Sequence, residues 1–316
     1  MEGIEHRKVS VNGISMHVAE KGEGPTVLLI HGFPELWYSW RHQIHALAAH
    51  GYRAVAPDMR GYGETDAPAS PASYTIFHVV GDLIALLDVL AQDQVYVVGQ
   101  DWGAIVAWYL CLFRPDRVKA LVNLSVNFLP RIPSKKPIEM IREFLGDDHY
   151  ICRFQEPGAT EADFASMDTA KLLTMLIANR NPHPLKIPKD GLRSLPDLGL
   201  PLPSWLSKED IDYYAHQFDK TGFTGGLNYY RALDLSWELL APWTGAQVTV
   251  PVKFIIGSLD LTYNTPGCKD YIHGGGFKKD VPSLQEVVVM DEVGHFINQE
   301  RPNDINAYIF DFFEKY

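Results

Sequence analysis

Short apolar runs alternate with helical patterns through the first 128 residues, and this alternation restricts the fold more than any other feature. An Asn12-Gly13 turn between two alternating runs predicts a β-hairpin at the start. Apolar runs rich in β-branched residues follow at 25–32, 52–58, 94–99 and 118–126, and segments of helical periodicity separate them. Strands and helices that alternate at this spacing predict an α/β fold, with a mostly parallel twisted sheet flanked by helices.

The alternation stops after residue 128 and returns near residue 250. Residues 129–242 hold helical patterns, a capping signature at Ser207-x-x-Asp210 and proline-rich links at 181–189 and 195–205. Strand signals then resume at 250–260 and 284–296. We therefore predict one sheet domain from residues 1–128 and 243–316, interrupted by an all-helical cap at 129–242.

Charge and cysteine usage exclude several kinds of partner. The formal net charge is −11, and no cluster of lysine and arginine is longer than a pair, which argues against nucleic-acid binding. The chain lacks a signal-peptide pattern and any apolar run of about 20 residues. Its three cysteines are too few for a disulfide framework and lack metal-ligand spacing. We expect a cytoplasmic protein without a membrane anchor, metal or cofactor.

The residues that follow the predicted strands suggest a catalytic set. The run at 94–99 leads into Gly99-Gln100-Asp101-Trp102-Gly103, a G-x-S-x-G elbow in which aspartate replaces the serine nucleophile. Asp260 and His295 follow the last two strands, so the chain order is nucleophile, acid, base. Alone, Asp101 would be read as a helix N-cap and Asp260 as a turn residue. Together they predict a catalytic triad, because functional groups gather at the carboxyl ends of parallel strands.

An aspartate at the elbow changes the chemistry of the first step. Its pKa near 4 makes Asp101 an anion at neutral pH, and the following helix N-terminus favours that charge. A carboxylate can displace a leaving group at saturated carbon without a base, which gives an alkyl ester. His295, oriented by Asp260, is then free to activate the water that hydrolyses the ester. We expect the backbone N–H groups of Phe33 and Trp102 to form the oxyanion hole.

These motifs resemble those of the soluble plant-type epoxide hydrolases of the α/β-hydrolase superfamily. The resemblance covers essentially the whole chain and is carried by "HGFPELWYSW", "GQDWGA", "GGLNYYRAL" and "GHFINQERP". It implies hydrolysis of epoxides to vicinal diols, with a small epoxide and water as the only partners. Epoxy fatty acids and aryl epoxides are the implied substrates. The oligomeric state stays open.

The resemblance also implies two cap tyrosines that protonate the epoxide oxygen, and these correspond to Tyr150 and Tyr230. The alternative for either residue is simple packing, and Tyr213 and Tyr214 form a second adjacent pair. Adjacent helical residues point about 100° apart, so only one of Tyr229 and Tyr230 can face the site.

The loop at residues 31–35 and the identity of the leaving group leave alternatives open. The resemblance places His31 and Glu35 in the loop that orients the hydrolytic water, but Glu35 is equally readable as an acid at a helix N-terminus. A haloalkane or haloacetate dehalogenase would use the same aspartyl ester, with the Trp102 indole binding the halide. Two phenols that converge on Asp101 would favour an epoxide, whereas a pair of indoles would favour a halide. A hydrolase-fold receptor without turnover is a third hypothesis.

Overall fold

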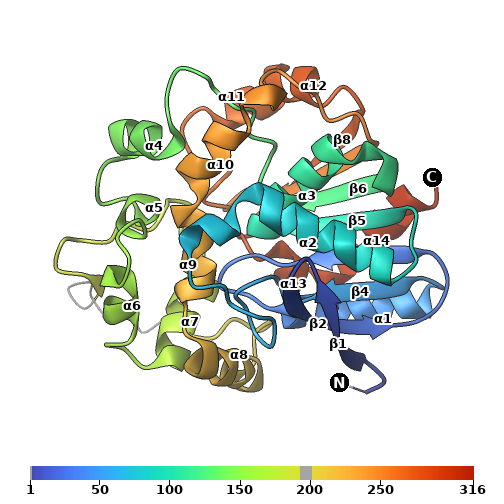
Figure 1. The fold of residues 1–316 in the computed structure, drawn as a ribbon, viewed down its shortest axis with the longest axis horizontal. Coiled ribbons are helices and arrows are strands. Elements are labelled where there is room, and N and C mark those ends of the chain that lie inside the picture. The colour runs from blue at the N-terminus through green and yellow to red at the C-terminus, as the bar shows by residue number, and fades with distance from the viewer. Residues whose placement is uncertain (1, 193–200) are drawn as a thin grey trace.

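An eight-stranded sheet forms the centre of the computed structural model, which describes residues 2–192 and 201–316 (Figure 1). The strand order is β1-β2-β4-β3-β5-β6-β7-β8. β1 and β2 form the predicted hairpin, β2 pairs antiparallel with β4, and every later pairing is parallel. The strands are β1 Glu5–Val11, β2 Ile14–Lys21, β3 Thr26–Ile30, β4 Arg53–Pro57, β5 Val95–Gln100, β6 Val118–Leu124, β7 Val252–Gly257 and β8 Leu284–Met290. The predicted α/β fold class is confirmed.

Helices cover both faces of this sheet, which explains why the central strands are apolar along their whole length. β3, β5 and β7 are buried at every residue. α2 and α3 pack together on one face, and α1 and α14 pack together on the other. The helices of this part are α1 Arg41–Ala49, α2 Ile76–Val89, α3 Trp102–Phe113, α11 Cys268–His273, α12 Gly276–Asp280, α13 Ile297–Glu300 and α14 Pro302–Phe313.

A group of helices lies between β6 and β7 and extends to one side of the sheet (Figure 1). Ser207 and Asp210 form the predicted capping box at the start of α8. Residues 193–200, which include part of a proline-rich link, lie outside the described residues. The helices are α4 Pro137–Leu145, α5 Tyr150–Arg153, α6 Ala159–Phe164, α7 Thr169–Ile177, α8 Lys208–Thr221, α9 Thr224–Arg231 and α10 Leu233–Leu239. The division into a core and a separate cap domain stays a prediction.

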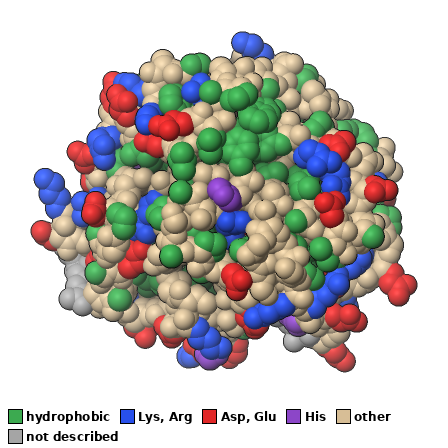
Figure 2. Space-filling view, in the orientation of Figure 1, with side chains coloured by type: hydrophobic (Ala, Val, Ile, Leu, Met, Phe, Trp, Pro, Cys, Tyr) green, Lys and Arg blue, Asp and Glu red, His purple; other side chains and the backbone are tan. Residues whose placement is uncertain are grey.

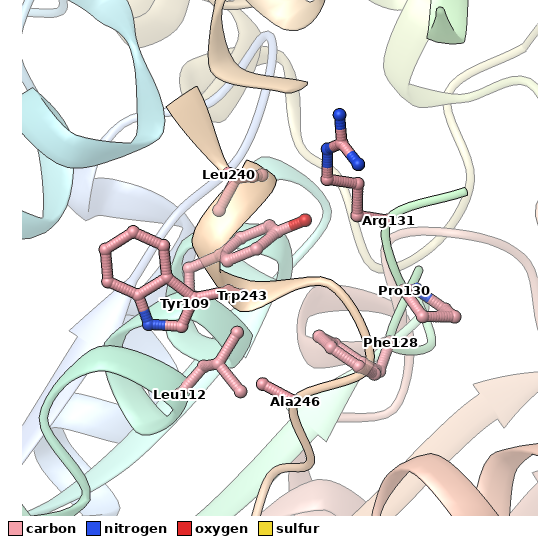
Figure 3. A pocket seen from close by; sticks show the side chains of 8 residues that line it. All are labelled: Tyr109, Leu112, Phe128, Pro130, Arg131, Leu240, Trp243 and Ala246. Atoms are coloured by element: carbon pink, nitrogen blue, oxygen red, sulfur yellow. The ribbon is translucent and has the colours of Figure 1, made fainter. Parts of the chain in front are cut away.

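The two connections of this helical stretch meet beside α3. Figure 3 shows a small crevice there, to which α3, the segment after β6 and the segment after α10 all contribute side chains. Arg131 holds the two connections together, because its guanidinium donates to Trp237 O at 2.8 Å and to Thr244 Oγ1 at 2.9 Å. The crevice is lined by Tyr109, Leu112, Phe128, Pro130, Arg131, Leu240, Trp243 and Ala246.

The surface carries charges of both signs. On the face shown in Figure 2, lysine and arginine side chains are interspersed with aspartate and glutamate. Within residues 2–192 and 201–316, every helix is too short or too polar to cross a bilayer.

Candidate active site

Asp101 sits at a sharp turn between β5 and α3. Its backbone has φ 55° and ψ −122°, a conformation that residues other than glycine rarely adopt and that is typical of a nucleophile elbow. Close packing explains the glycines on either side. A Cβ on Gly103 would lie 1.9 Å from Ile30 O, and one on Gly99 would lie 2.5 Å from Gly103 O. The elbow therefore presents the Asp101 carboxylate at the carboxyl edge of the sheet.

The structure brings Asp101, His295 and Asp260 together in one hydrogen-bonded row. His295 Nδ1 lies 2.9 Å from Asp260 Oδ1, and His295 Nε2 lies 3.2 Å from Asp101 Oδ2. Asp260 is fully buried, and the Thr262 N–H and hydroxyl each donate to its Oδ1 at 2.8 Å. A carboxylate only accepts, so the imidazole Nδ1 carries a proton and its orientation is fixed by Asp260.

The loop after β3 covers the other oxygen of the Asp101 carboxylate. Phe33 N–H donates to Asp101 Oδ1 at 2.7 Å. Gly32 permits this contact, since a Cβ there would lie 2.4 Å from Asp101 Oδ1. The His31 side chain holds this loop in place, because its Nδ1 donates to Gly32 O at 2.9 Å and its Nε2 accepts from Met59 N–H at 3.0 Å. Burial lowers the pKa of His31, in keeping with this neutral tautomer.

Tyr150 and Tyr230 approach the elbow from the helical stretch. Tyr150 begins α5, Tyr230 lies near the end of α9, and their ring centroids are 5.9 Å apart. The Tyr230 ring also makes an edge contact with Trp102, the residue after Asp101, at 5.1 Å. Burial raises the pKa of both phenols, and the negative charge of Asp101 raises each pKa further. Both hydroxyls are therefore un-ionised at neutral pH and close enough to sense Asp101.

The other candidate tyrosines are engaged elsewhere. Tyr229 donates its hydroxyl to Arg60 O at 2.9 Å in a buried contact, so it points away from Asp101. Tyr213 accepts from the Trp37 indole at 3.0 Å, and Tyr214 lies 3.5 Å from Gln299 Oε1. Trp37 and Trp40 are buried within the hydrophobic core.

Comparisons with known proteins agree with this site. A family model of the alpha/beta hydrolase fold matches residues 25–151. Epoxide hydrolase 2 of Siraitia grosvenorii is 63% identical over the full length of both chains, and epoxide hydrolase A of Mycobacterium tuberculosis is 39% identical over 97% of this chain and 96% of its own. The structure of epoxide hydrolase I from potato (Solanum tuberosum) superposes with a TM-score of 0.96 at 56% identity, covering 99% of this chain and all of the other. This chain belongs to the epoxide hydrolases of the α/β-hydrolase fold. These similarities support the resemblance seen in the sequence over the dehalogenase and receptor alternatives.

The histidine of this epoxide hydrolase has a strongly perturbed pKa. Burial acts to lower the pKa of His295, but the charges and hydrogen bonds of Asp260 and Asp101 outweigh burial and raise it well above the usual value. Asp260 and Asp101 therefore favour the imidazolium form of His295. Because one of those carboxylates is the elbow aspartate, any reaction that removes its charge lowers the pKa of His295.

Two residues of the epoxide hydrolase site are absent from the sequence-based prediction. Gln100 Nε2 and Ser125 Oγ both donate to the His295 carbonyl oxygen, at 3.0 and 2.7 Å, in fully buried contacts. In the sequence, each is only a polar residue at the carboxyl end of a buried strand. Many strands end in this way, so the pattern does not identify a functional residue. The contacts fix the backbone that carries the imidazole.

Glu35 lies in the interior of the epoxide hydrolase and caps no helix. It precedes Trp37–Trp40, a 3₁₀ turn whose first residues include no acid. The side chain is fully buried, and its Oε1 accepts from Gln299 Nε2 at 2.7 Å. Its Oε2 has no hydrogen-bond partner among the described residues. Burial, with the nearby charge of Asp101, raises the pKa of Glu35 to about 8.

Proposed function

We propose that this enzyme opens epoxides in two covalent steps, with Asp101 as nucleophile, His295 and Asp260 activating water, and Tyr150 and Tyr230 as acids. One observation carries the proposal: the two oxygens of the Asp101 carboxylate have different surroundings. Oδ1 accepts from Phe33 N–H at 2.7 Å, whereas Oδ2 lies 3.2 Å from His295 Nε2. A carboxylate held in this way can attack with Oδ2 while Oδ1 stays in the oxyanion hole.

In the first step Asp101 Oδ2 attacks one epoxide carbon and the carbon–oxygen bond of the ring breaks. The electron pair goes to the epoxide oxygen, which takes a proton from the Tyr150 or Tyr230 phenol. The product is a hydroxyalkyl ester of Asp101 and a transient tyrosinate. The pKa values of both phenols lie above the ordinary value of 10, so both hydroxyls keep their protons at neutral pH and can act as acids.

In the second step His295 becomes a base because the ester has no charge. Esterification removes the charge and the acceptor through which Asp101 raises the pKa of His295. The imidazolium gives its Nε2 proton, through solvent, to the tyrosinate left by the first step. The neutral imidazole then takes a proton from water, which attacks Cγ of Asp101, and the N–H groups of Phe33 and Trp102 stabilise the oxyanion on Oδ1. Collapse breaks the ester bond and releases the vicinal diol, to which His295 returns the proton. Asp101 retains the oxygen from water, and the second proton of that water passes from its carboxyl group to His295, which restores the starting state.

The surroundings of the site support epoxy fatty acids and aryl epoxides as the substrate class. Phe154 contacts both Phe33 and Tyr230, with ring centroids 5.9 and 5.1 Å apart. Such a wall favours an apolar or aromatic substituent on the epoxide. The proposal includes a cytoplasmic location, because Cys111, Cys152 and Cys268 are free thiols, as a reducing compartment maintains them.

An isotope experiment tests the covalent route. One turnover with styrene oxide in oxygen-18 water should place the label in the Asp101 carboxylate and leave the first diol unlabelled. Mass spectrometry of the Asp101 peptide and of the diol measures both. Label that appears directly in the diol would exclude the ester intermediate.

The division of labour between the two steps is tested by His295→Ala. This variant should form the ester and hydrolyse it at least about 1000-fold more slowly, since the general base of the second step is missing. The adduct is detected as added mass on the Asp101 peptide. His183→Ala, at an exposed histidine, is the control and should turn over normally. If His295→Ala fails to form the ester, Asp101 requires the histidine for attack and the assignment is wrong.

A further inference from the structure

Gln299 links Glu35 to Arg41 through one buried side-chain amide. The amide Nε2 donates to Glu35 Oε1 at 2.7 Å, and the amide Oε1 accepts from Arg41 Nη1 at 2.6 Å. Glu35 and Gln299 are fully buried, and Arg41 is 6% exposed. Gln299 lies in α13, four residues after His295, so this row of side chains runs directly behind the catalytic histidine.

The chemistry of these three groups fixes the orientation of the amide. A guanidinium can only donate hydrogen bonds, so it must face the amide oxygen, which leaves the NH₂ group for Glu35. That NH₂ occupies Glu35 Oε1. The lone pairs or the proton of Oε2, which has no partner among the described residues, are then available to a water molecule in the site. With Arg41 removed, the amide could rotate and turn its oxygen toward Glu35.

Arg41 is itself held by α8 of the helical stretch. Its Nε lies 3.1 Å from Asp210 Oδ1, and its guanidinium carbon lies 4.8 Å from the centre of the Tyr38 ring. The Tyr38 hydroxyl donates to the same Asp210 oxygen at 2.9 Å. The second oxygen of Asp210 accepts from the N–H and hydroxyl of Ser207, so this carboxylate also begins the helix. The row of contacts therefore reaches from α8 to Glu35.

We propose that Gln299 and Arg41 are positioning residues for ester hydrolysis, which keep Glu35 Oε2 directed at the hydrolytic water and make this step depend on the docking of α8. The inference rests on the proposed function and on the role that the sequence resemblance implies for Glu35, the orientation of that water. It concerns the second step only, because Asp101 attacks the epoxide without help from water.

Arg41→Met and Gln299→Leu test the proposal in the full-length enzyme with styrene oxide. Rapid quenching followed by mass spectrometry measures the formation and the decay of the Asp101 ester separately. Ester formation should stay within about twofold of the wild type, and ester decay should slow about 10-fold in each variant, since a displaced water loses its reactive geometry. In the steady state kcat and KM should fall together, so that kcat/KM is nearly unchanged.

The matched control is Arg53→Met. Arg53 also pairs with a partly buried carboxylate, Glu20, but it begins β4, at the opposite edge of the sheet from the carboxyl ends where Asp101 lies, so its loss should leave both steps unchanged. Arg41→Lys should recover part of the decay rate, because an ammonium can still donate to the amide oxygen of Gln299. A purely structural role for Arg41 would slow both steps equally, lower Tm in proportion and give no recovery with lysine.

Glu35→Gln separates the inference from the function on which it rests. If Glu35→Gln slows ester decay but Arg41→Met and Gln299→Leu do not, the positioning role is wrong while the role of Glu35 stands. If Glu35→Gln has no effect on ester decay, the proposed role of Glu35 fails first. When all three slow the decay, the double variant Glu35→Gln/Gln299→Leu should be no slower than Glu35→Gln alone.

Discussion

The sheet side and the helical side of the active site are held in different ways. On the sheet side, Asp101, His295 and Asp260 follow three strands, and hydrogen bonds of 2.7–3.2 Å fix their side chains. On the helical side, the ring of Tyr230 is in contact with the rings of Tyr150 and Trp102. Hydrogen bonds set a geometry within a few tenths of an ångström, whereas ring packing tolerates small rotations.

In the proposed mechanism, the acid of the first step comes from the helical side and the base of the second step comes from the sheet side. The nucleophile and the base need a fixed position relative to each other, and the strands of a buried parallel sheet provide it. The acid must meet an oxygen whose position changes with the substrate, and two phenols on separate short helices can adapt to that change. Loss of the two phenols should therefore slow ester formation, and loss of the groups that hold His295 should slow ester decay.

Removal of both phenol hydroxyls is expected to have the largest effect. In Tyr150→Phe/Tyr230→Phe the alkoxide has no acid, so ester formation should fall by at least about 1000-fold, and each single variant should lose about 10- to 100-fold. Rapid-quench measurement of the Asp101 ester reports the rate. Tyr229→Phe is the control, because its hydroxyl donates to Arg60 O and its loss should affect stability but not ester formation. If the double variant forms the ester at the wild-type rate, the two phenols do not protonate the epoxide oxygen.

The sheet side was largely predictable from the sequence, and the helical side was not. Asp101, Asp260 and His295 each follow a strand signal, and parallel strands bring their carboxyl ends to one edge, so chain order was enough. The choice of Tyr230 over Tyr229 depended on resemblance. The structural reason is the packing of α9: a Cβ on Gly225 would lie 2.0 Å from Gly61 O, and this close approach turns Tyr229 toward Arg60.

Hydrogen bonds between residues far apart in the chain also could not be predicted from the sequence. Gln100 and Ser125 donate to the His295 carbonyl oxygen, which lies 195 and 170 residues further along the chain. The residues around them in the sequence do not indicate this partner. The link from Asp210 through Arg41 and Gln299 to Glu35 is of the same kind. α11 and α12 were missed for another reason, since helices of only six and five residues carry too little periodicity.

Glu35 lies where the two sides meet, and its burial should be visible as a dependence of stability on pH. The folded-state pKa is raised from 4.5 to about 8, so the folded protein holds this proton more tightly than the unfolded chain does. The contribution of Glu35 to the free energy of unfolding should therefore fall as the pH rises from about 4.5 to 8, and stay constant above that. Glu35→Gln does not titrate and retains an acceptor for Gln299.

The difference in free energy of unfolding between Glu35→Gln and the wild type should consequently shift in favour of the variant by about 2–4 kcal/mol as the pH rises from 5 to 9. Denaturant unfolding of both proteins at pH 5, 7 and 9 measures this difference, and the remaining titrating groups cancel in the comparison. A difference that is constant with pH would mean that the Glu35 carboxyl is not destabilised in the folded enzyme.

The smallest effect is expected from the two donors behind His295, and it sharpens the contrast between the steps. Ser125→Ala leaves the His295 carbonyl with Gln100 as a donor, so ester decay should slow only about threefold, and Ser125→Ala/Gln100→Leu should slow it about 10-fold. Ester formation should not change in either variant, because Asp101 attacks without a base. Rapid quenching measures both rates, and denaturant unfolding should show a loss of about 1–2 kcal/mol for the double variant. Equal slowing of the two steps would mean that these donors hold the elbow as well as the histidine, and that the sheet side works as one rigid unit.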